Sequence, residues 1–227
     1  MTKRRVGIIG DTHLPYELDG YLDFCKHIFK SWKVDTVVHI GDLVDHHALS
    51  FHESEPSLKG ANGELFDARD SLVDWYKAFP NLNLVLGNHD LIPQRQLKAI
   101  GMDHTYWMKD LKDVYSMPKG WRVDQNFTID GVIYHHGYSS NGTNGFRNDA
   151  AKRMQCSVSG HNHSNAGVSA SASEHRLVWG LATGCGVDNE KMAFAYGKHN
   201  LNKPIVACGI VIDGKYPFVE YMDLGEK

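Results

Sequence analysis

Residues 6–13 read VGIIGDTH, a short apolar run that ends in glycine and leads to an aspartate and a histidine. The apolar part is typical of a buried strand, and glycine lets the backbone turn sharply where that strand ends. In extended backbone, alternate side chains point the same way, so Asp11 and His13 can aim at one site. This stretch predicts a strand that delivers two polar side chains to the edge of a sheet.

The same pattern occurs twice more in the first half of the chain. Residues 36–40 lead into Gly41-Asp42, with Asp45 three positions later, and residues 82–86 lead into Gly87-Asn88-His89-Asp90. Segments with apolar residues at helical spacing lie between these runs, over residues 18–32 and 65–76. Strand, helix, strand, helix, strand predicts βαβ crossovers and a mostly parallel sheet, whose carboxyl strand ends converge on one edge.

The second half has a more antiparallel character. Asp130-Gly131 and Asp213-Gly214 each separate two strand-like runs and predict tight hairpins. We also expect a helix over residues 144–154, strands over 156–159 and 177–181, and short loops over 139–144 and 164–173. The whole pattern predicts an α/β fold, a four-layer β-sandwich of two mixed sheets flanked by helices, in one domain over residues 1–227 without a cap domain.

Composition narrows the class of protein. The 227 residues carry 24 basic and 27 acidic side chains, a net charge of −3, which argues against binding nucleic acid through bulk charge. The four cysteines are widely spaced without a CxxC pair, which favours a reducing compartment. The apolar run near the N-terminus is too short for a signal peptide, and no run approaches the roughly 20 apolar residues that span a bilayer. We expect a cytoplasmic protein that does not contact membranes.

Two later segments add histidines to the same kind of position, at His135-His136-Gly137 and at Gly160-His161-Asn162-His163. Any one of these motifs alone is more often a turn or a solvated loop, but their joint occurrence at five strand ends indicates a metal centre. Carboxylate, amide and imidazole donors suit Mn²⁺, our first choice, or Fe, Zn²⁺, Ni²⁺ or Co²⁺. The candidate ligands number too many for one open site and fit two ions about 3.5–4 Å apart; they are Asp11, His13, Asp42, Asn88, His136, His161 and His163.

The five blocks together resemble the signature of the calcineurin-like metallophosphoesterase superfamily: GDxH, GDxxD, GNH[DE], a histidine before glycine, and GHxH, in that order between residues 10 and 163. The resemblance implies a dinuclear phosphoesterase in which a metal-bridging hydroxide attacks a phosphodiester or phosphomonoester. It assigns Asp11, His13 and His163 to one ion, Asn88, His136 and His161 to the other, and Asp42 to both. It also implies that His89 is a catalytic residue outside the ligand set, oriented by Asp45.

The resemblance leaves the substrate open between a phosphorylated small molecule and nucleic acid. His46 and Asp90 stand where the phosphoprotein phosphatase branch has arginine and glutamate, which argues against protein serine/threonine phosphatase activity. A DNA or RNA nuclease is the alternative function, and a non-catalytic scaffold is a third. The oligomeric state is not predicted.

Several residues outside the blocks are candidates for substrate contact, each with a plainer alternative. His46, His47 and His52 follow the second block, and they either contact phosphate or lie on the surface. Three arginines could also bind phosphate: Arg95, Arg147 and Arg153. Tyr106 and Trp107 could stack on a base, although we favour packing in the core. His135 is ranked behind His136 as a ligand, because alternation makes it face away.

Overall fold

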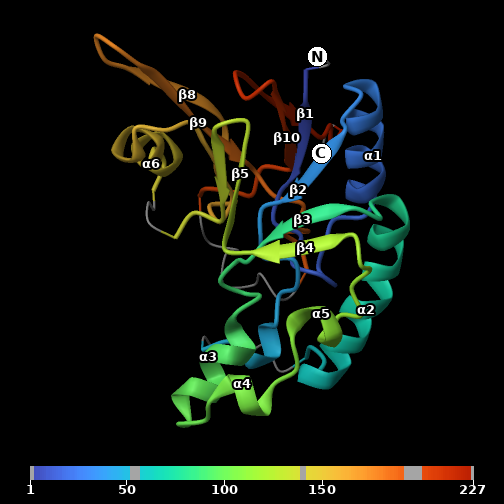
Figure 1. Ribbon diagram of the computed structural model, residues 1–227. Helices are drawn as coiled ribbons and strands as arrows, with labels where there is room; N and C mark the ends of the chain where they lie inside the picture. Colours follow the sequence, from blue (N-terminus) through green and yellow to red (C-terminus); the bar gives the residue numbers. More distant parts are fainter. Residues whose placement is uncertain (1–2, 52–56, 139–141, 192–200, 226–227) are drawn as a thin grey trace.

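Two β-sheets lie face to face in the computed structural model, which describes residues 3–51, 57–138, 142–191 and 201–225. One sheet has six strands in the order β11-β10-β1-β2-β3-β4, and the other has five in the order β5-β6-β7-β9-β8. Figure 1 shows α1 and α2 along one side of the molecule and α6 beside the second sheet. The predicted fold class, a sandwich of two mixed sheets flanked by helices, is confirmed.

The six-stranded sheet contains the predicted parallel core. β1, β2, β3 and β4 run parallel, whereas β10 is antiparallel to both β1 and β11. Its crossover helices have the expected apolar stripes and cover one face of the sheet. The bounds are β1 (Arg5–Ile9), α1 (Tyr21–Ser31), β2 (Thr36–His39), α2 (Ala61–Ala78), β3 (Leu82–Val85), β4 (Trp121–Asp124), β10 (Ala207–Ile212) and β11 (Tyr216–Tyr221).

The five-stranded sheet is less antiparallel than the sequence suggests. β6, β7 and β9 run parallel, and only its outer strands β5 and β8 are antiparallel to their neighbours. The carboxyl ends of β6 and β7 therefore point the same way. The bounds are β5 (Asn126–Ile129), β6 (Val132–His135), α6 (Gly145–Arg153), β7 (Ser157–Ser159), β8 (Ala166–Ala172) and β9 (Leu177–Thr183).

Both Asp-Gly pairs form the predicted hairpin turns. Asp130 and Gly131 have φ values of 50° and 80°, and Asp213 and Gly214 have values of 55° and 65°. Positive φ at both central residues is the geometry of the type I′ turn, whose twist matches that of the paired strands.

The structure corrects the prediction of a loop over residues 164–173, because β8 occupies most of that segment. β8 has the sequence AGVSASA, in which Val168 is the one β-branched residue and there is no aromatic residue to mark a strand. Its strand conformation comes from seven residue pairs with β9. Further short helices also went unpredicted: η1 (His47–Leu49), α3 (Ile92–Ala99), α4 (His104–Trp107) and α5 (Leu111–Val114).

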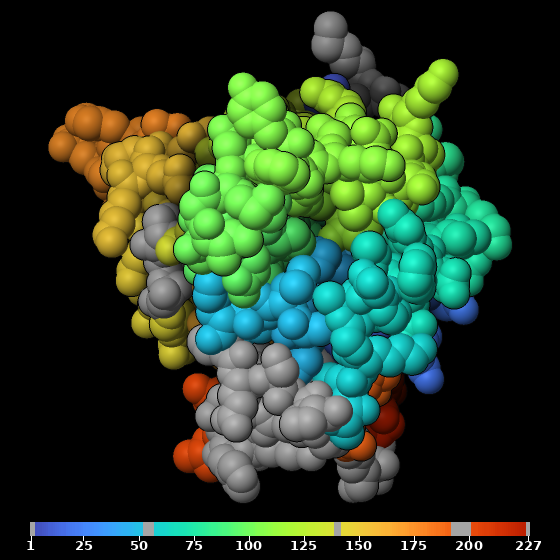
Figure 2. Space-filling view, turned by 90° about the horizontal axis from the view of Figure 1, so that it is seen from below, coloured from blue at the N-terminus to red at the C-terminus, as the bar shows by residue number. Residues whose placement is uncertain are grey.

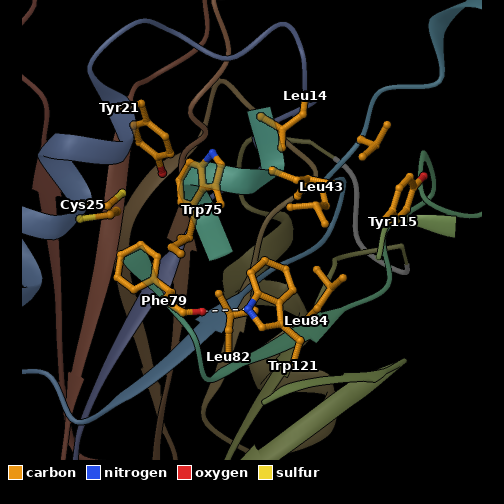
Figure 3. Packing of buried hydrophobic residues seen from close by; sticks show 14 of the residues in the cluster. Leu14, Tyr21, Cys25, Leu43, Trp75, Phe79, Leu82, Leu84, Tyr115 and Trp121 are labelled. Carbon is orange, nitrogen blue, oxygen red and sulfur yellow. Dashed lines mark hydrogen bonds between the residues drawn. The ribbon is translucent and has the colours of Figure 1, made fainter. Parts of the chain in front are cut away.

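The two largest hydrophobic clusters of the described residues lie one on each face of the six-stranded sheet, and a small third cluster contains Tyr16, Cys185 and Val187. Figure 3 shows the large cluster beneath α1 and α2, where Trp75 and Trp121 are fully buried. The indole of Trp121 donates a hydrogen bond to the carbonyl of Phe79 at 2.8 Å. The other large cluster fills the space between the sheets with residues such as Ile8 and Trp179. Each large apolar side chain buried here contributes about 1.5–3 kcal/mol, and together they fix the strand ends.

The short helices form the lower end of the molecule in Figure 1. Seen from below in Figure 2, the surface of α3 and α4 (green) lies beside the segment around η1 (light blue). The side-chain amide of Gln96 on α3 donates to the carbonyl of Leu49 at 2.6 Å and joins the two segments. Among the described residues, no helix has both the length and the apolar character that crossing a membrane requires.

Candidate metal centre

The predicted ligands meet where five strand ends from the two sheets converge. Asp11 follows β1, Asp42 follows β2, Asn88 follows β3, His136 follows β6, and His161 follows β7. Carboxyl ends of parallel strands meet at one edge of a sheet. The parallel pairing of β6 with β7 places the histidines of the second sheet opposite the carboxylates of the first.

One cluster joins Asp11, His13 and His163, whose potential ligand atoms all lie within 4.8 Å of one another. Nε2 of His163 lies 3.3 Å from Oδ2 of Asp11 and 3.1 Å from Nε2 of His13. The other carboxylate oxygen of Asp11, Oδ1, is buried and has no hydrogen-bond partner among the described residues. A buried carboxylate oxygen without a donor is costly, and a cation would compensate it.

A second cluster joins Asp42, His136 and His161 within the same 4.8 Å limit. Nε2 of His136 lies 3.1 Å from Oδ2 of Asp42 and 3.0 Å from Oδ1 of Asn88. Its Nδ1 donates to the carbonyl of Ile40 at 3.0 Å, which leaves Nε2 as the nitrogen that faces the cluster.

Asp42 also belongs to the first side of the centre. Its Oδ2 lies 3.5 Å from Nε2 of His13, and Asp42, His13 and His89 form a third group of possible ligand atoms. The same oxygen therefore faces both clusters. A carboxylate between two sets of nitrogen and oxygen donors is the arrangement that a pair of divalent ions requires.

Asp45 is buried beside this centre, where its side chain contacts two of the histidines. Its Oδ1 accepts a hydrogen bond from Nδ1 of His13 at 2.6 Å and lies 3.2 Å from Nδ1 of His89. Nδ1 of His89 also donates to the carbonyl of Asp45 at 2.6 Å, which leaves Nε2 for another partner. The backbone N–H of His89 donates to Oδ1 of Asp42 at 2.7 Å. These contacts place the His89 side chain beside the centre, with about 23% of it exposed.

Burial and neighbouring charges oppose each other in this cluster. Burial raises the pKa of Asp42, but the nearby histidines, His136 above all, outweigh it and hold that pKa well below the usual range. For His89, burial lowers the pKa, but the hydrogen bond to Asp45 and the charges of Asp42 and Asp45 raise it overall to about 10. The carboxylates around His89 therefore favour its protonated form.

Buried polar residues behind the ligands join the ends of β1 and β2 by hydrogen bonds. His39 is fully buried; its Nδ1 accepts from the N–H of Gly41 at 3.2 Å, so its Nε2 carries the proton toward Oγ1 of Thr12 at 3.1 Å. Thr12 in turn donates to the carbonyl of Leu43 at 3.0 Å. This bridge between the first two blocks was not predicted, because nothing in the sequence pairs residue 12 with residue 39.

Asp90, in the third block, joins that block to the second by hydrogen bonds. Its Oδ1 accepts from the N–H groups of Leu43 and Val44 at 3.0 and 3.4 Å, and its Oδ2 accepts from Gly87 at 2.8 Å. Gly87 itself leaves no room for a side chain, since an added Cβ would lie 2.2 Å from Oδ1 of Asp42. The residue that separates this chain from the GNHE pattern is therefore a buried structural carboxylate.

Two of the histidines beyond the second block are buried rather than exposed at the surface. His46 is buried, and its Nε2 hydrogen-bonds the hydroxyl of Tyr115. His47 is buried as well, and its backbone N–H donates to Oε1 of Glu64 at 2.7 Å. His52 lies outside the described residues.

The remaining candidates divide between the two ends of the molecule. Nε of Arg147 lies 3.4 Å from Oγ of Ser171. Nε of Arg153 donates to Oδ2 of Asp149 at 2.6 Å, and the same oxygen lies 2.8 Å from Nε2 of His135. These contacts on α6 confirm that His135 faces away from His136. Arg95 instead lies on α3, with its guanidinium 5.1 Å from the ring centroid of Phe51. The expectation that two aromatic residues pack in the core is wrong, because α4 is a short surface helix that exposes 85% of Tyr106 and 68% of Trp107.

Comparison with known proteins gives one family. The family described as calcineurin-like phosphoesterase matches residues 4–171. Similar solved structures include an archaeal phosphodiesterase (18% identity, 96% of this chain and 99% of that chain, TM-score 0.48) and a Sphaerobacter thermophilus metallophosphoesterase (14%, 98% and 89%, TM-score 0.47). Another is Vacuolar Protein Sorting 29 from Cryptosporidium parvum (13%, 100% and 100%, TM-score 0.49). No curated protein matches the sequence significantly.

Proposed function

The chain belongs to the calcineurin-like phosphoesterase family, and on this premise we propose that it is a hydrolase that cleaves a phosphate ester at a dinuclear metal centre. The observation that carries the proposal is the position of Asp42, one of whose oxygens faces both ligand clusters. A single-ion site would not need a carboxylate shared in this way.

Seven side chains would hold the ions. Asp11, His13 and His163 form one set, and Asn88, His136 and His161 form the other, with Asp42 common to both. Mn²⁺ is the first ion to test, because oxygen and imidazole donors without thiolates suit it. When bound, two such ions neutralise the charge of the phosphate and lower the pKa of a water to near neutrality, so that it can serve as nucleophile.

The chain's own residues would supply the proton chemistry. His89 stands beside Asp42 with its Nδ1 held by Asp45, so its Nε2 is the atom that donates a proton to the departing ester oxygen. General acid catalysis of this kind contributes about 10²–10⁴-fold to the rate. Asp45 raises the pKa of the His89 imidazole and orients it, and its Oδ1 also orients the ring of His13 by accepting from Nδ1.

The test is hydrolysis by protein that has been stripped with a chelator and then reconstituted. We expect no turnover of bis-p-nitrophenyl phosphate or p-nitrophenyl phosphate without metal, and turnover after addition of about two equivalents of Mn²⁺ per chain. Turnover that saturates at one equivalent would contradict the dinuclear mechanism. Degradation of single- or double-stranded DNA in preference to both esters would identify the nuclease alternative.

A further inference from the structure

We propose that Tyr138 and Arg95 form a substrate subsite beside the metal centre that binds an aromatic group, so that the preferred substrate is a phosphodiester carrying a nucleobase or a comparable ring. This inference rests on the proposed phosphoesterase function and specifies its substrate class. We call Phe51, Arg95 and Tyr138 the aromatic rim.

Tyr138 lies against the second ligand cluster and is still open to solvent. Its ring centroid is 5.3 Å from that of His136 and 6.4 Å from that of His161, and 47% of the residue is exposed. The hydroxyl donates to the carbonyl of Leu86 at 3.2 Å, just before the third ligand block. A tyrosine anchored at both ends has little conformational freedom left to lose when another ring packs on it.

Arg95 extends the rim from the other side of the third block. It lies on α3, which begins three residues after His89, and its guanidinium stacks over the ring of Phe51, which is 53% exposed. Tyr138 is hydrogen-bonded to Leu86, just before the third block, and Arg95 lies on the helix just after it, so the two residues are joined to the two ends of that block. The contact of α3 with the η1 segment, seen from below in Figure 2, holds this side of the rim in place.

The side chains of the aromatic rim are suited to binding a flat aromatic ring. A flat aromatic ring stacks on tyrosine and on guanidinium whatever its sequence identity, because every base presents a π-face. Tyr138 packs beside His136, whose Nε2 faces Asp42, so it is placed to contact a group carried by a phosphate that binds at this centre. The plainer explanation is that Tyr138 only covers the two histidines, and in that case its loss would alter metal binding rather than substrate choice.

Two matched pairs of compounds separate these explanations in the Mn²⁺-loaded protein. Thymidine 5′-(p-nitrophenyl phosphate) and methyl p-nitrophenyl phosphate share the scissile bond and differ only in the second ester group. Phenylphosphonate and methylphosphonate contain no ester and report binding alone, by calorimetry. We expect the thymidine ester to be favoured over the methyl ester in kcat/KM, and phenylphosphonate over methylphosphonate in affinity, each by about 5- to 150-fold, the range that stacking of one base gives.

The variants assign that preference to the rim. Tyr138→Leu is expected to reduce the preference for the aromatic member of each pair to near one while the metal content stays near two per chain. Tyr138→Phe, which keeps the ring, should retain most of it. Tyr216→Leu is the control, because Tyr216 is 51% exposed and lies near a lysine but belongs to β11 at the far edge of the sheet.

The outcomes distinguish this inference from the proposed function. Equal kcat/KM for the two esters with equal affinity for the two phosphonates overturns the rim and leaves the phosphoesterase intact. Loss of metal from Tyr138→Leu, with both esters slowed equally, also overturns it and assigns the tyrosine a covering role. Binding that favours phenylphosphonate without turnover of either ester supports the rim and contradicts the proposed function.

Discussion

Two regions of this molecule bury carboxyl groups, and they do so in opposite ways. At the strand ends, Asp42 and Asp45 are surrounded by imidazoles and N–H donors, so their pKa values fall below the usual range despite burial. Between the first sheet and α2, Glu17 accepts one hydrogen bond from the indole of Trp75 at 2.8 Å, and burial raises its pKa to about 7. The charges of nearby histidines offset the cost of burying Asp42 and Asp45, whereas burial outweighs the groups around Glu17, so the strand ends are where cations are expected to bind.

The largest effect should follow from removing the shared carboxylate. Asp42→Ala leaves both clusters without their common oxygen, so the ions lose a ligand on each side. We expect a loss of at least about 10³-fold in kcat together with loss of bound Mn²⁺, measured by kinetics and by elemental analysis. Asp23→Ala, at an exposed position on α1, is the control. Full activity of Asp42→Ala with two ions retained would show that the assignment is wrong.

A smaller effect is expected from removing the proton donor while leaving the ligands. His89→Gln should lower kcat by about 10²–10⁴-fold, because the charged imidazole beside Asp45 is lost. The metal content should stay near two per chain, since His89 is assigned no ion. If the variant lost one ion, His89 would instead be a ligand, as its grouping with His13 and Asp42 allows.

A smaller effect still is expected from breaking the hydrogen bonds of Thr12 with His39 and Leu43. Thr12→Val removes the hydroxyl that joins His39 to Leu43 and leaves the Nε2–H of a buried histidine without its acceptor. Loss of groups that orient ligands typically costs 10–100-fold in metal affinity, and we expect about that weakening in a Mn²⁺ titration. Thr12→Ser keeps the hydroxyl and should bind as the wild type does. Equal affinity in Thr12→Val would mean that the strand ends hold their positions without this bridge.

The smallest effect concerns the carboxyl group of Glu17, whose contribution to stability depends on pH. The pKa of Glu17 is higher in the folded than in the unfolded chain, so the stability it contributes is present below about pH 4.5 and is lost as pH rises through about 7. Glu17→Gln keeps an acceptor for Trp75 and avoids that loss. It should therefore unfold like the wild type at pH 4.5 and be roughly 2 kcal/mol more stable at pH 8. Asp70→Asn, at an exposed position on α2, is the control for thermal or denaturant unfolding. A stabilisation of equal size at both pH values would exclude ionisation of Glu17 as its cause.

The sequence predicted the strand ends well because their signal is local. A buried apolar run followed by glycine and a donor, as in residues 6–13, predicts both a strand and the direction of its last side chains. The seven candidate ligands were therefore placed on converging ends before their distances were known. The contacts of Asp45 with His13, and of Thr12 with His39, arise from segments about 30 residues apart, and no local pattern reports them.

The sequence predicted the lower end of the molecule poorly, for physical reasons. α3 buries only Ile92 among its described residues, and α4 and α5 have four residues each, so none presents a long apolar stripe. Tyr106 and Trp107 were expected in a core that this surface helix does not reach. β8 is a strand because β9 pairs with it, not because its serines and alanines favour one.

The most direct test of the dinuclear centre is anomalous diffraction from crystals of the protein soaked with Mn²⁺. We expect two peaks about 3.5–4 Å apart, one beside Asp11, His13 and His163 and the other beside Asn88, His136 and His161, with a carboxylate oxygen of Asp42 between them. A single peak, or peaks that leave Asp42 without a metal contact, would contradict this expectation.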